Sequence, residues 1–483
     1  MISFTISLFA LIVGYIVYGR FITRIFGPDN RTTPAYTLQD GVDYIPMPTW
    51  KIYMIQFLNI AGTGPIFGAI MGAMFGPSCY LWIVFGCIFA GAVHDYISGM
   101  ISIRQNGCSH TEIIGKYLGK GTKKVMIVFT VFLLILVGAV FVSSPALILK
   151  NLTAGIPFMN FYFWMAVVFV YYIIATLLPI DKIIGKIYPL FAFALIFMAV
   201  GLMFALFVHW PSIPEVTDGL ANLNPNKATN PIFPCLFITI ACGAISGFHA
   251  TQSPLMARCM KNEKYGRPVF YGAMITEGVV ALVWAAVSSY FFFDPSSGNS
   301  DMTVQAPNVV EIMSKRWLGT VGGVLAILGV VAAPITTGDT SLRSARLIIA
   351  DSLKISQKSL RSRIYISIPL FMLVALVIWL NMSGDSGFNV IWGYFAWTNQ
   401  TLAVFTLWAL TVYLVKNKKL YIVTLIPAIF MTTISVSYIC AAPNTLALPR
   451  NITYPIAAAT ALVSAIWFFV WKSKAAKKEA TKD

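Results

Sequence analysis

Charged side chains are scarce in this chain. They make up 11% of the 483 residues, whereas 58% are hydrophobic. A soluble globular domain usually carries about 25% charged residues, so the composition excludes that class. The mean hydropathy of +0.77 is typical of a chain that lies mostly in lipid. Acidic residues number only 18 against 34 Lys and Arg, and the position of this positive excess is informative.

Sequence motifs of enzymes and of metal or disulfide sites are also lacking. The seven cysteines are scattered without a CxxC pair, which argues against a disulfide framework or a metal cluster and favours small apolar packing. The sequence contains no GxxxxGK[ST] phosphate loop, HExxH, GxSxG or paired acidic metal motif. We therefore predict neither an enzyme nor an ATP-driven pump, and no organic cofactor.

Long hydrophobic runs occupy most of the sequence. Because each bilayer crossing needs about 20 apolar residues, we predict thirteen membrane helices within one all-α domain, residues 1–471. They lie near residues 2–19, 52–75, 79–101, 125–149, 159–178, 187–209, 232–256, 269–293, 318–338, 364–381, 388–415, 420–441 and 452–471. A basic tail, residues 472–483, follows them.

The positive charges lie on alternate loops. With the N-terminus outside, 29 of the 34 Lys and Arg fall in inward loops and the tail. This asymmetry follows the positive-inside rule and predicts an outer N-terminus and an inner C-terminus. The net charge of +16 is thus explained by membrane topology and contact with lipid headgroups, and no nucleic-acid partner is expected.

Two hydrophobic segments are interrupted where a membrane helix should be continuous. The first segment is Gln56–Gly68, which contains the cluster Gly62-Thr63-Gly64-Pro65, and the second is Ala241–Pro254. They lie five segments apart on helices of opposite direction. This predicts an inverted repeat, residues 52–209 and 232–415, with extra helices at residues 1–19 and 420–471. Matched breaks of this kind are typical of the midplane binding site of a transporter.

Polar groups at the two breaks form the predicted substrate site. Helix N-termini near Gly64 and Gly247 would favour an anionic group such as a carboxylate. His249 would add a hydrogen bond or a proton, although a buried histidine equally often serves packing. The predicted substrate-binding residues are Asn59, Gly62, Thr63, Gly64, Ser246, Gly247, His249 and Gln252.

Three carboxylates lie within hydrophobic segments, where a charge is costly. Glu277, Asp95 and Asp339 are therefore the candidates for proton coupling. Each also has a structural alternative. Glu277 would bond a neighbouring helix, Arg104 would neutralise Asp95, and Arg343 would pair with Asp339 at the i+4 position.

The segment around Asp339 carries two further predictions. Thr336 and Thr337 offer hydroxyls to a sodium ion together with carbonyls freed near Gly62, although such hydroxyls commonly bond their own helix. The basic stretch 339–363 is predicted to continue its membrane helix or to lie at the cytoplasmic membrane surface, with a regulatory contact as the weaker alternative.

Several motifs of this sequence closely resemble the carbon starvation protein A (CstA) family. They are Asp40-Gly-Val-Asp-Tyr-Ile-Pro46, Ala61-Gly-Thr-Gly-Pro65, Phe89-Ala-Gly-Ala-Val-His-Asp95, Cys242-Gly-Ala-Ile-Ser-Gly-Phe-His249 and Asp339-Thr. The resemblance covers roughly residues 1–410. It implies an inner-membrane protein of the amino acid–polyamine–organocation superfamily, with a LeuT-type five-plus-five inverted repeat. Members are associated with peptide uptake during carbon starvation, and some are proton-coupled pyruvate transporters.

The chain also departs from this family. It resembles a shorter branch, without the extended C-terminal region of the long members, and His94 stands where those often have Gln. Residues and resemblance together predict a proton symporter that imports peptides first and pyruvate second. The alternatives are sodium coupling, a transporter-like nutrient sensor, and a lipid-modifying membrane enzyme. The sequence makes no prediction of oligomeric state.

Overall fold

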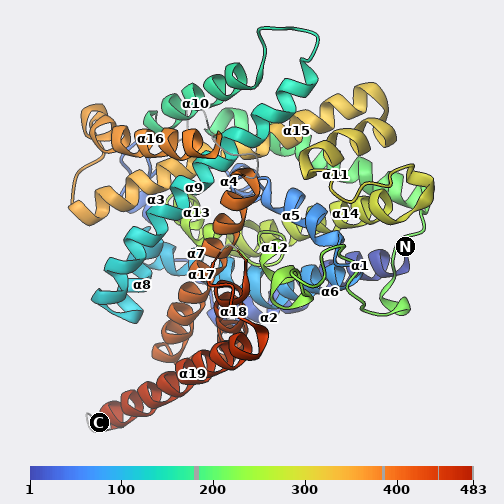
Figure 1. The fold of residues 1–483 in the computed structure, drawn as a ribbon. Coiled ribbons are helices and arrows are strands. Elements are labelled where there is room, and N and C mark those ends of the chain that lie inside the picture. The colour runs from blue at the N-terminus through green and yellow to red at the C-terminus, as the bar shows by residue number, and fades with distance from the viewer. Residues whose placement is uncertain (179–183, 383–386, 444, 481–483) are drawn as a thin grey trace.

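The chain folds into a bundle of helices joined by loops (Figure 1). The computed structural model describes residues 1–178, 184–382, 387–443 and 445–480, which contain no β-strand. The helices are α1 (Ile2–Ile16), α2 (Tyr18–Phe26), α3 (Pro34–Thr37), α4 (Thr49–Ile60), α5 (Gly64–Ala73), α6 (Ser78–Phe85), α7 (Ala92–Arg104), α8 (His110–Leu118), α9 (Lys120–Leu152), α10 (Phe161–Leu177), α11 (Ile184–His209), α12 (Phe237–Thr239), α13 (Gly247–Ala257), α14 (Ala273–Phe293), α15 (Ala306–Leu353), α16 (Leu360–Met382), α17 (Gly387–Lys416), α18 (Ile422–Ala441) and α19 (Arg450–Ala480).

Short π-helical and 3₁₀ turns supplement these helices. The π-helical turns are Gly86–Gly91, Ile232–Leu236 and Arg267–Gly272, and the 3₁₀ turns are Val216–Asp218, Glu263–Tyr265 and Pro295–Ser297. Two of the π-helical turns lead directly into α7 and α14. A π turn contains an extra residue, so it rotates the side chains that follow it relative to those before it.

Within the described residues, ten helices are long and apolar enough to cross a membrane, or eleven if α4 and α5 form one bent span. The hydrophobic runs of the sequence predict thirteen spans. The two remaining predicted segments are 159–178, which contains the shorter apolar helix α10 of 17 residues, and 232–256, which the second break divides. The multi-pass membrane class is thus confirmed, while the count of thirteen and the outer N-terminus stay predictions.

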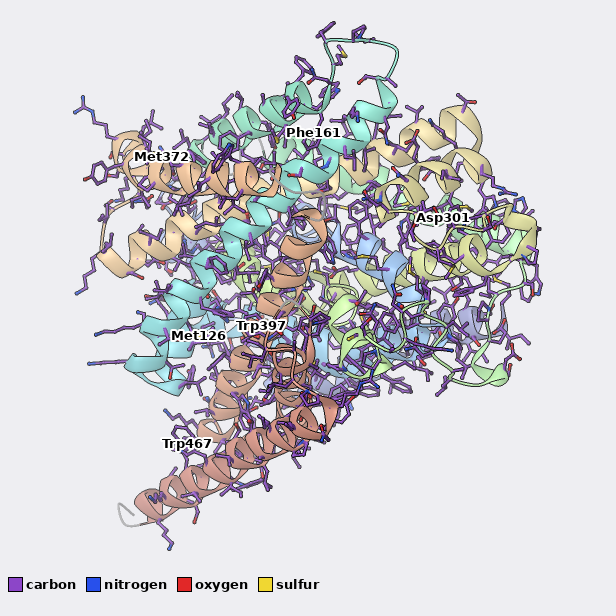
Figure 2. All side chains as sticks on the ribbon, in the orientation of Figure 1. Met126, Phe161, Asp301, Met372, Trp397 and Trp467 are labelled. Atoms are coloured by element: carbon purple, nitrogen blue, oxygen red, sulfur yellow. The ribbon has the colours of Figure 1, made fainter. Side chains whose placement is uncertain are left out.

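Apolar side chains cover the outside of the bundle. Met372 on α16 and Trp467 on α19, both labelled in Figure 2, are 61% and 75% exposed. In water such exposure would be costly, whereas lipid tails solvate these side chains well. Helix α19 projects away from the other helices towards the C-terminus (Figure 1).

The two interrupted segments pack against each other near the centre of the bundle. An added Cβ at Gly64 would lie 2.3 Å from Cys242 Sγ, and one at Gly68 would lie 2.7 Å from the Thr239 carbonyl oxygen. Glycine is thus required for the close approach of the two backbones, as is common between membrane helices. Around this pair, α15 packs along α9 and α11, and α13 packs against α7 and α17.

Helix α15 continues well beyond the predicted membrane segment 318–338. This agrees with the prediction that residues 339–363 continue that helix. Helix α15 ends at Leu353. Arg343 and Arg346 are only 1% and 0% exposed, so this part of the segment lies inside the bundle. The alternative of a helix on the membrane surface is wrong for these residues, since neighbouring elements cover them completely.

Candidate functional site

Both predicted breaks interrupt helices. The first separates α4 from α5 at residues 61–63 and bends the chain by 46°. The second leaves residues 240–246 outside regular helix, between α12 and α13. The predicted half-helix N-termini are therefore confirmed, because α5 begins at Gly64 and α13 begins at Gly247.

A buried polar face leads to the N-terminus of α5. Asn59 and Gln56 lie three residues apart on α4, and Thr63 precedes the first residue of α5. All three are 0% exposed, and none of their side-chain N or O atoms has a hydrogen-bond partner among the described residues. Burying polar groups without partners is costly, so this face is suited to a polar solute.

The N-terminus of α13 is, by contrast, partly satisfied by the protein. Asn399 of α17 accepts hydrogen bonds at Oδ1 from the Phe248 amide (2.7 Å) and from Ser246 Oγ (3.0 Å). An added Cβ at Gly247 would lie 2.3 Å from the Ala403 amide nitrogen. Ser246 and Gly247 thus hold α13 against α17, whereas the Thr63 side chain at the start of α5 makes no hydrogen bond within the described part of the chain.

Three buried titratable side chains form a continuous chain beside the second break. His249 on α13 contacts Asp95 Oδ2 of α7 through Nδ1, at 2.9 Å. Its Nε2 lies 3.4 Å from Glu277 Oε2 of α14. All three residues are 0% exposed. These side chains therefore link α7, α13 and α14 inside the bundle.

The carboxylates of Asp95 and Glu277 differ in their hydrogen bonds. His94 contacts Asp95 Oδ1 through Nδ1 at 2.8 Å, so both Asp95 oxygens are occupied. Neither Glu277 oxygen makes a hydrogen bond to a described residue.

Both carboxylates lie shortly after a π-helical turn. Asp95 follows the turn Gly86–Gly91 by four residues, and Glu277 follows the turn Arg267–Gly272 by five. Such turns recur at functional sites.

The predicted neutralisation of Asp95 by Arg104 is wrong. Arg104 donates from Nε to Glu263 (2.5 Å) and from Nη2 to the Gly27 carbonyl (2.6 Å). Arg104 ends α7, nine residues after Asp95, which places it about 13 Å further along the helix. Histidines, not an arginine, therefore neutralise or bond Asp95.

The predicted pairing of Asp339 with Arg343 is also wrong. The Tyr188 hydroxyl of α11 donates to Asp339 Oδ1, and Asp339 Oδ2 has no partner in the described part of the chain. Arg343 instead donates to Asp43 and to carbonyls at the end of α10. Asp339 thus lies apart from the chain of Asp95, His249 and Glu277 in its bonding.

The two threonines of the candidate sodium site differ. Thr337 Oγ1 donates to the Leu58 carbonyl of α4 (3.1 Å) as well as to the Ala333 carbonyl. Among the described residues, Thr336 Oγ1 bonds its own helix alone, at the carbonyls of Ala332 and Ala333. Thr337 therefore meets the broken helix as predicted, and the hydroxyl of Thr336 points back to α15.

Gln252 connects the second break to α15. Its Nε2 donates to Thr251 Oγ1 (2.8 Å) and approaches Ser344 Oγ (3.4 Å), and its Oε1 has no described partner. Gly62, at the first break, lies against α9 and α15, since an added Cβ would meet Phe141 at 2.8 Å and Thr337 Oγ1 at 3.1 Å.

A possible metal-binding geometry was not anticipated from the sequence. One donor atom each of Cys242, His249 and Glu277 lies within 4.8 Å of the others. The cysteine was assigned to packing because it lacks a CxxC partner, and only the fold brings it to the histidine. Gln56 was likewise missed, although its spacing from Asn59 places both on one helix face.

The sequence matches a known family over most of its length. The profile of the family described as carbon starvation protein CstA matches residues 1–163, 150–315 and 297–438. A Haemophilus influenzae membrane protein is 46% identical over 62% of this chain and 93% of its own. The peptide transporter CstA of Campylobacter jejuni is 30% identical over 56% of this chain and 47% of its own.

A further relative is the pyruvate/proton symporter BtsT of Escherichia coli, 27% identical over 63% of this chain and 52% of its own. This chain thus matches only about half the length of the two relatives with named transport activities. Each named activity belongs to the longer protein.

Solved structures share the fold. A manganese transporter of Eremococcus coleocola aligns with a TM-score of 0.58 and 12% identity, over 90% of this chain and 98% of its own. MhsT in complex with L-phenylalanine aligns with a TM-score of 0.55 and 14% identity, over 87% and 99%. These are LeuT-fold transporters, and at such identity the likeness concerns the fold alone. With its family profile and its helical architecture in agreement, this chain belongs to the carbon starvation protein CstA family.

Proposed function

We propose that this protein is a secondary active transporter that imports carboxylate-bearing solutes, peptides or pyruvate, by proton symport. One observation carries the proposal: two broken helices lie side by side at a buried cluster of unpartnered polar groups, next to the chain of Asp95, His249 and Glu277. The named activities of the CstA and BtsT relatives support this substrate class.

The substrate would lie at the first break. The uncapped N-terminus of α5 supplies partial positive charge for a carboxylate, and Asn59 and Gln56 supply amide donors and acceptors for its polar groups. In a dry, closed site these hydrogen bonds are stronger than in water. Closure also keeps the solute from exchanging with solvent during the transition.

Proton coupling would use Glu277. Its two carboxylate oxygens make no hydrogen bond to a described residue, unlike those of Asp95, so a proton there alters the link to His249 and hence the contact between α14 and α13. Because α13 carries the second break, protonation would favour one orientation of the broken segment. Transport follows only if substrate and proton both bind that state better than the other.

Uptake of labelled pyruvate and dipeptide into proteoliposomes, driven by an inward proton gradient without sodium, tests this function. A monocarboxylate imported with one proton is electroneutral, so each unit of pH gradient should sustain about tenfold accumulation. Glu277→Gln should abolish accumulation but retain counterflow of substrate. Glu311→Gln is the matched control, since Glu311 pairs with Lys315 at 2.7 Å on the edge of the bundle.

The results separate the alternatives. Proton-driven accumulation by Glu277→Gln equal to wild type would remove Glu277 from the mechanism. Accumulation only in a sodium gradient, lost in Thr337→Val, would favour the sodium-coupled rival, which the Thr337 contact with Leu58 motivates. Binding without counterflow would favour a sensor. Loss of uptake with a chelator would point instead to a metal ion at Cys242, His249 and Glu277.

A further inference from the structure

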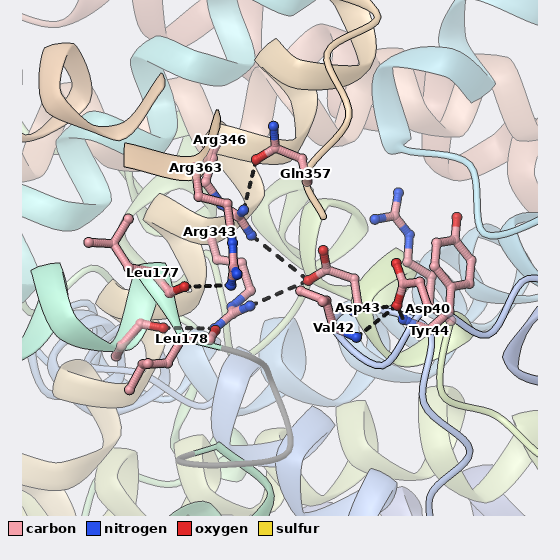
Figure 3. Close-up of polar contacts among 12 residues, drawn as sticks. Asp40, Val42, Asp43, Tyr44, Leu177, Leu178, Arg343, Arg346, Gln357 and Arg363 are labelled. Carbon is pink, nitrogen blue, oxygen red and sulfur yellow. Dashed lines mark hydrogen bonds and ion pairs between the residues drawn. The ribbon is translucent and has the colours of Figure 1, made fainter. Parts of the chain in front are cut away.

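The family motif Asp40–Pro46 forms a compact loop that the proposed transport site does not use. We call residues 40–46 the strap. Asp40 Oδ1 accepts hydrogen bonds from the amides of Val42, Asp43 and Tyr44 at 2.8–3.0 Å, which closes the loop on itself. Asp40 thereby fixes the direction of the Asp43 side chain, which points into the bundle and is 4% exposed. Figure 3 shows this arrangement.

Asp43 meets two fully buried arginines of α15. Arg343 Nη1 lies 3.3 Å and Arg346 Nη2 lies 3.8 Å from Asp43 Oδ1. Arg343 Nη2 also donates to the carbonyls of Ala175 and Leu178, and Arg346 Nη1 donates to Gln357 (Figure 3). One carboxylate of the strap thus serves two guanidinium groups that come from a single helix.

The arginines are not fully satisfied by this carboxylate. Nε of Arg343, and both Nε and Nη2 of Arg346, have no hydrogen-bond partner within the described ranges. Arg363 adds a third guanidinium, which donates to the Leu177 carbonyl. Buried guanidinium donors without partners are costly. The planar guanidinium group binds carboxylates in a bidentate manner. The donors without partners can therefore make more hydrogen bonds to a carboxylate than Asp43 makes.

The arginines lie between the candidate substrate site and an open cavity. Arg343 follows Thr337 by six residues, about 9 Å along α15, and the adjacent Ser344 contacts Gln252. On the other side, a cavity of about 820 Å³ is lined by Tyr44 and Arg258 among others, at the end of α15. Under the predicted topology this cavity faces the cytoplasm, so the strap and the arginines stand on the exit route.

We propose that Arg343 and Arg346 form a second subsite for the carboxylate of the transported solute, on its way to the cytoplasm, and that Asp43 occupies this subsite in the present conformation. The arriving carboxylate exchanges with that of Asp43, and the strap lifts from the bundle. The exchange conserves charge, because one carboxylate replaces another beside the same two guanidinium groups. The inference rests on the proposed function, since it assumes a carboxylate-bearing substrate.

A native cysteine beneath the strap can report on this movement. Cys259 is 0% exposed, its Sγ approaches the Asp43 carbonyl at 3.8 Å, and its own carbonyl accepts from the Met47 amide at 3.2 Å. Burial raises the pKa of the Cys259 thiol to about 12. The thiol is therefore unreactive while the strap covers it.

The test is the rate of maleimide labelling of Cys259 in the purified full-length protein, measured by peptide mass spectrometry. Acetate and pyruvate should each accelerate labelling about fivefold, because they compete with Asp43 for the arginines. Acetamide, which has the shape of acetate without its charge, should not. Asp43→Asn should label rapidly without any addition, and Arg346→Gln should lose the response to carboxylates. Arg361→Gln, an exposed arginine on α16, is the matched control.

Two outcomes would overturn the proposal: no acceleration by either carboxylate in wild type, or equal acceleration in Arg346→Gln. If Arg346→Gln does not fold, Arg346→Lys replaces it, because lysine keeps the charge but not the fork and should weaken the response. Glu277→Gln should retain the labelling response. Uptake without a labelling response refutes the subsite alone, whereas a labelling response without uptake refutes the transport function and leaves a carboxylate site.

Discussion

The contact between α13 and α17 at Gly247 provides a quantitative test of the site. A Cβ added to Gly247 would lie 2.3 Å from the Ala403 amide nitrogen and 2.5 Å from the Asn399 carbonyl oxygen, both backbone atoms. Contacts below 3.0 Å essentially do not occur, so α13 and α17 would have to separate by at least 0.7 Å in Gly247→Ala. Side-chain rotation cannot relieve a clash between two backbones.

The expected cost has two parts. Overpacking of this kind costs about 1–3 kcal/mol, and weakening of the Asn399 hydrogen bonds at the start of α13 adds about 1 kcal/mol. Together they should lower the free energy of unfolding by about 2–4 kcal/mol. Because His249 lies two residues after Gly247, the same displacement should lengthen its 2.9 Å contact with Asp95 and impair transport.

Gly121→Ala is the matched control. Gly121 lies in α9, and apart from its chain neighbours and its own helix backbone no heavy atom of a described residue lies within 4 Å of an added Cβ there. Alanine in a helix is about 0.5–1 kcal/mol more favourable than glycine, so this variant should be as stable as wild type or slightly more so. Thermal unfolding in detergent and counterflow of pyruvate would be compared for both variants. Equal stability and equal counterflow in Gly247→Ala and Gly121→Ala would refute the reasoning.

Three further predictions concern buried polar groups. Tyr188→Phe should destabilise the protein by about 1–3 kcal/mol, because Asp339 loses its donor; unchanged thermal unfolding would contradict this. Arg104→Gln should cost about 1.5–3 kcal/mol, because Glu263 loses one charged partner and keeps Arg31 at 3.1 Å, and a double variant with Glu263→Gln should recover part of the loss in the same assay. Burial opposes ionisation of Asp43, but the charges of the arginines outweigh it and hold its pKa below the ordinary value. A lowered pKa stabilises the folded state above the unfolded pKa of about 3.9 and loses this effect only at lower pH. Cys259 labelling, normalised to the denatured protein, should therefore stay constant from neutral to mildly acidic pH, and acceleration near pH 6 would show that another group controls the strap.

The sequence alone determined the helix breaks and the buried titratable residues, because both depend on residue type within a short segment. Clustered glycine and proline weaken a helix, because glycine costs conformational entropy and proline removes a backbone hydrogen bond, so the breaks at Gly62–Pro65 and before Gly247 could be predicted from residue types. The rarity of charge in hydrophobic segments likewise identified Asp95 and Glu277 as buried groups that need partners. His249 was identified as a candidate for the same reason, because few titratable residues lie at comparable depth.

Only the tertiary structure decided which of these groups are partners. Asp95 and His249 are 154 residues apart in sequence, and their 2.9 Å contact depends on how α7 packs against α13. The helical spacing of Asp339 and Arg343 predicted an ion pair, yet Arg343 bonds the distant Asp43. A buried guanidinium is stabilised by whichever acceptors the packing brings to it, and sequence spacing constrains only neighbours on one helix. The burial of these side chains could thus be predicted from the composition of their segments. Their hydrogen-bond and ion-pair partners depend on how the helices pack in the bundle.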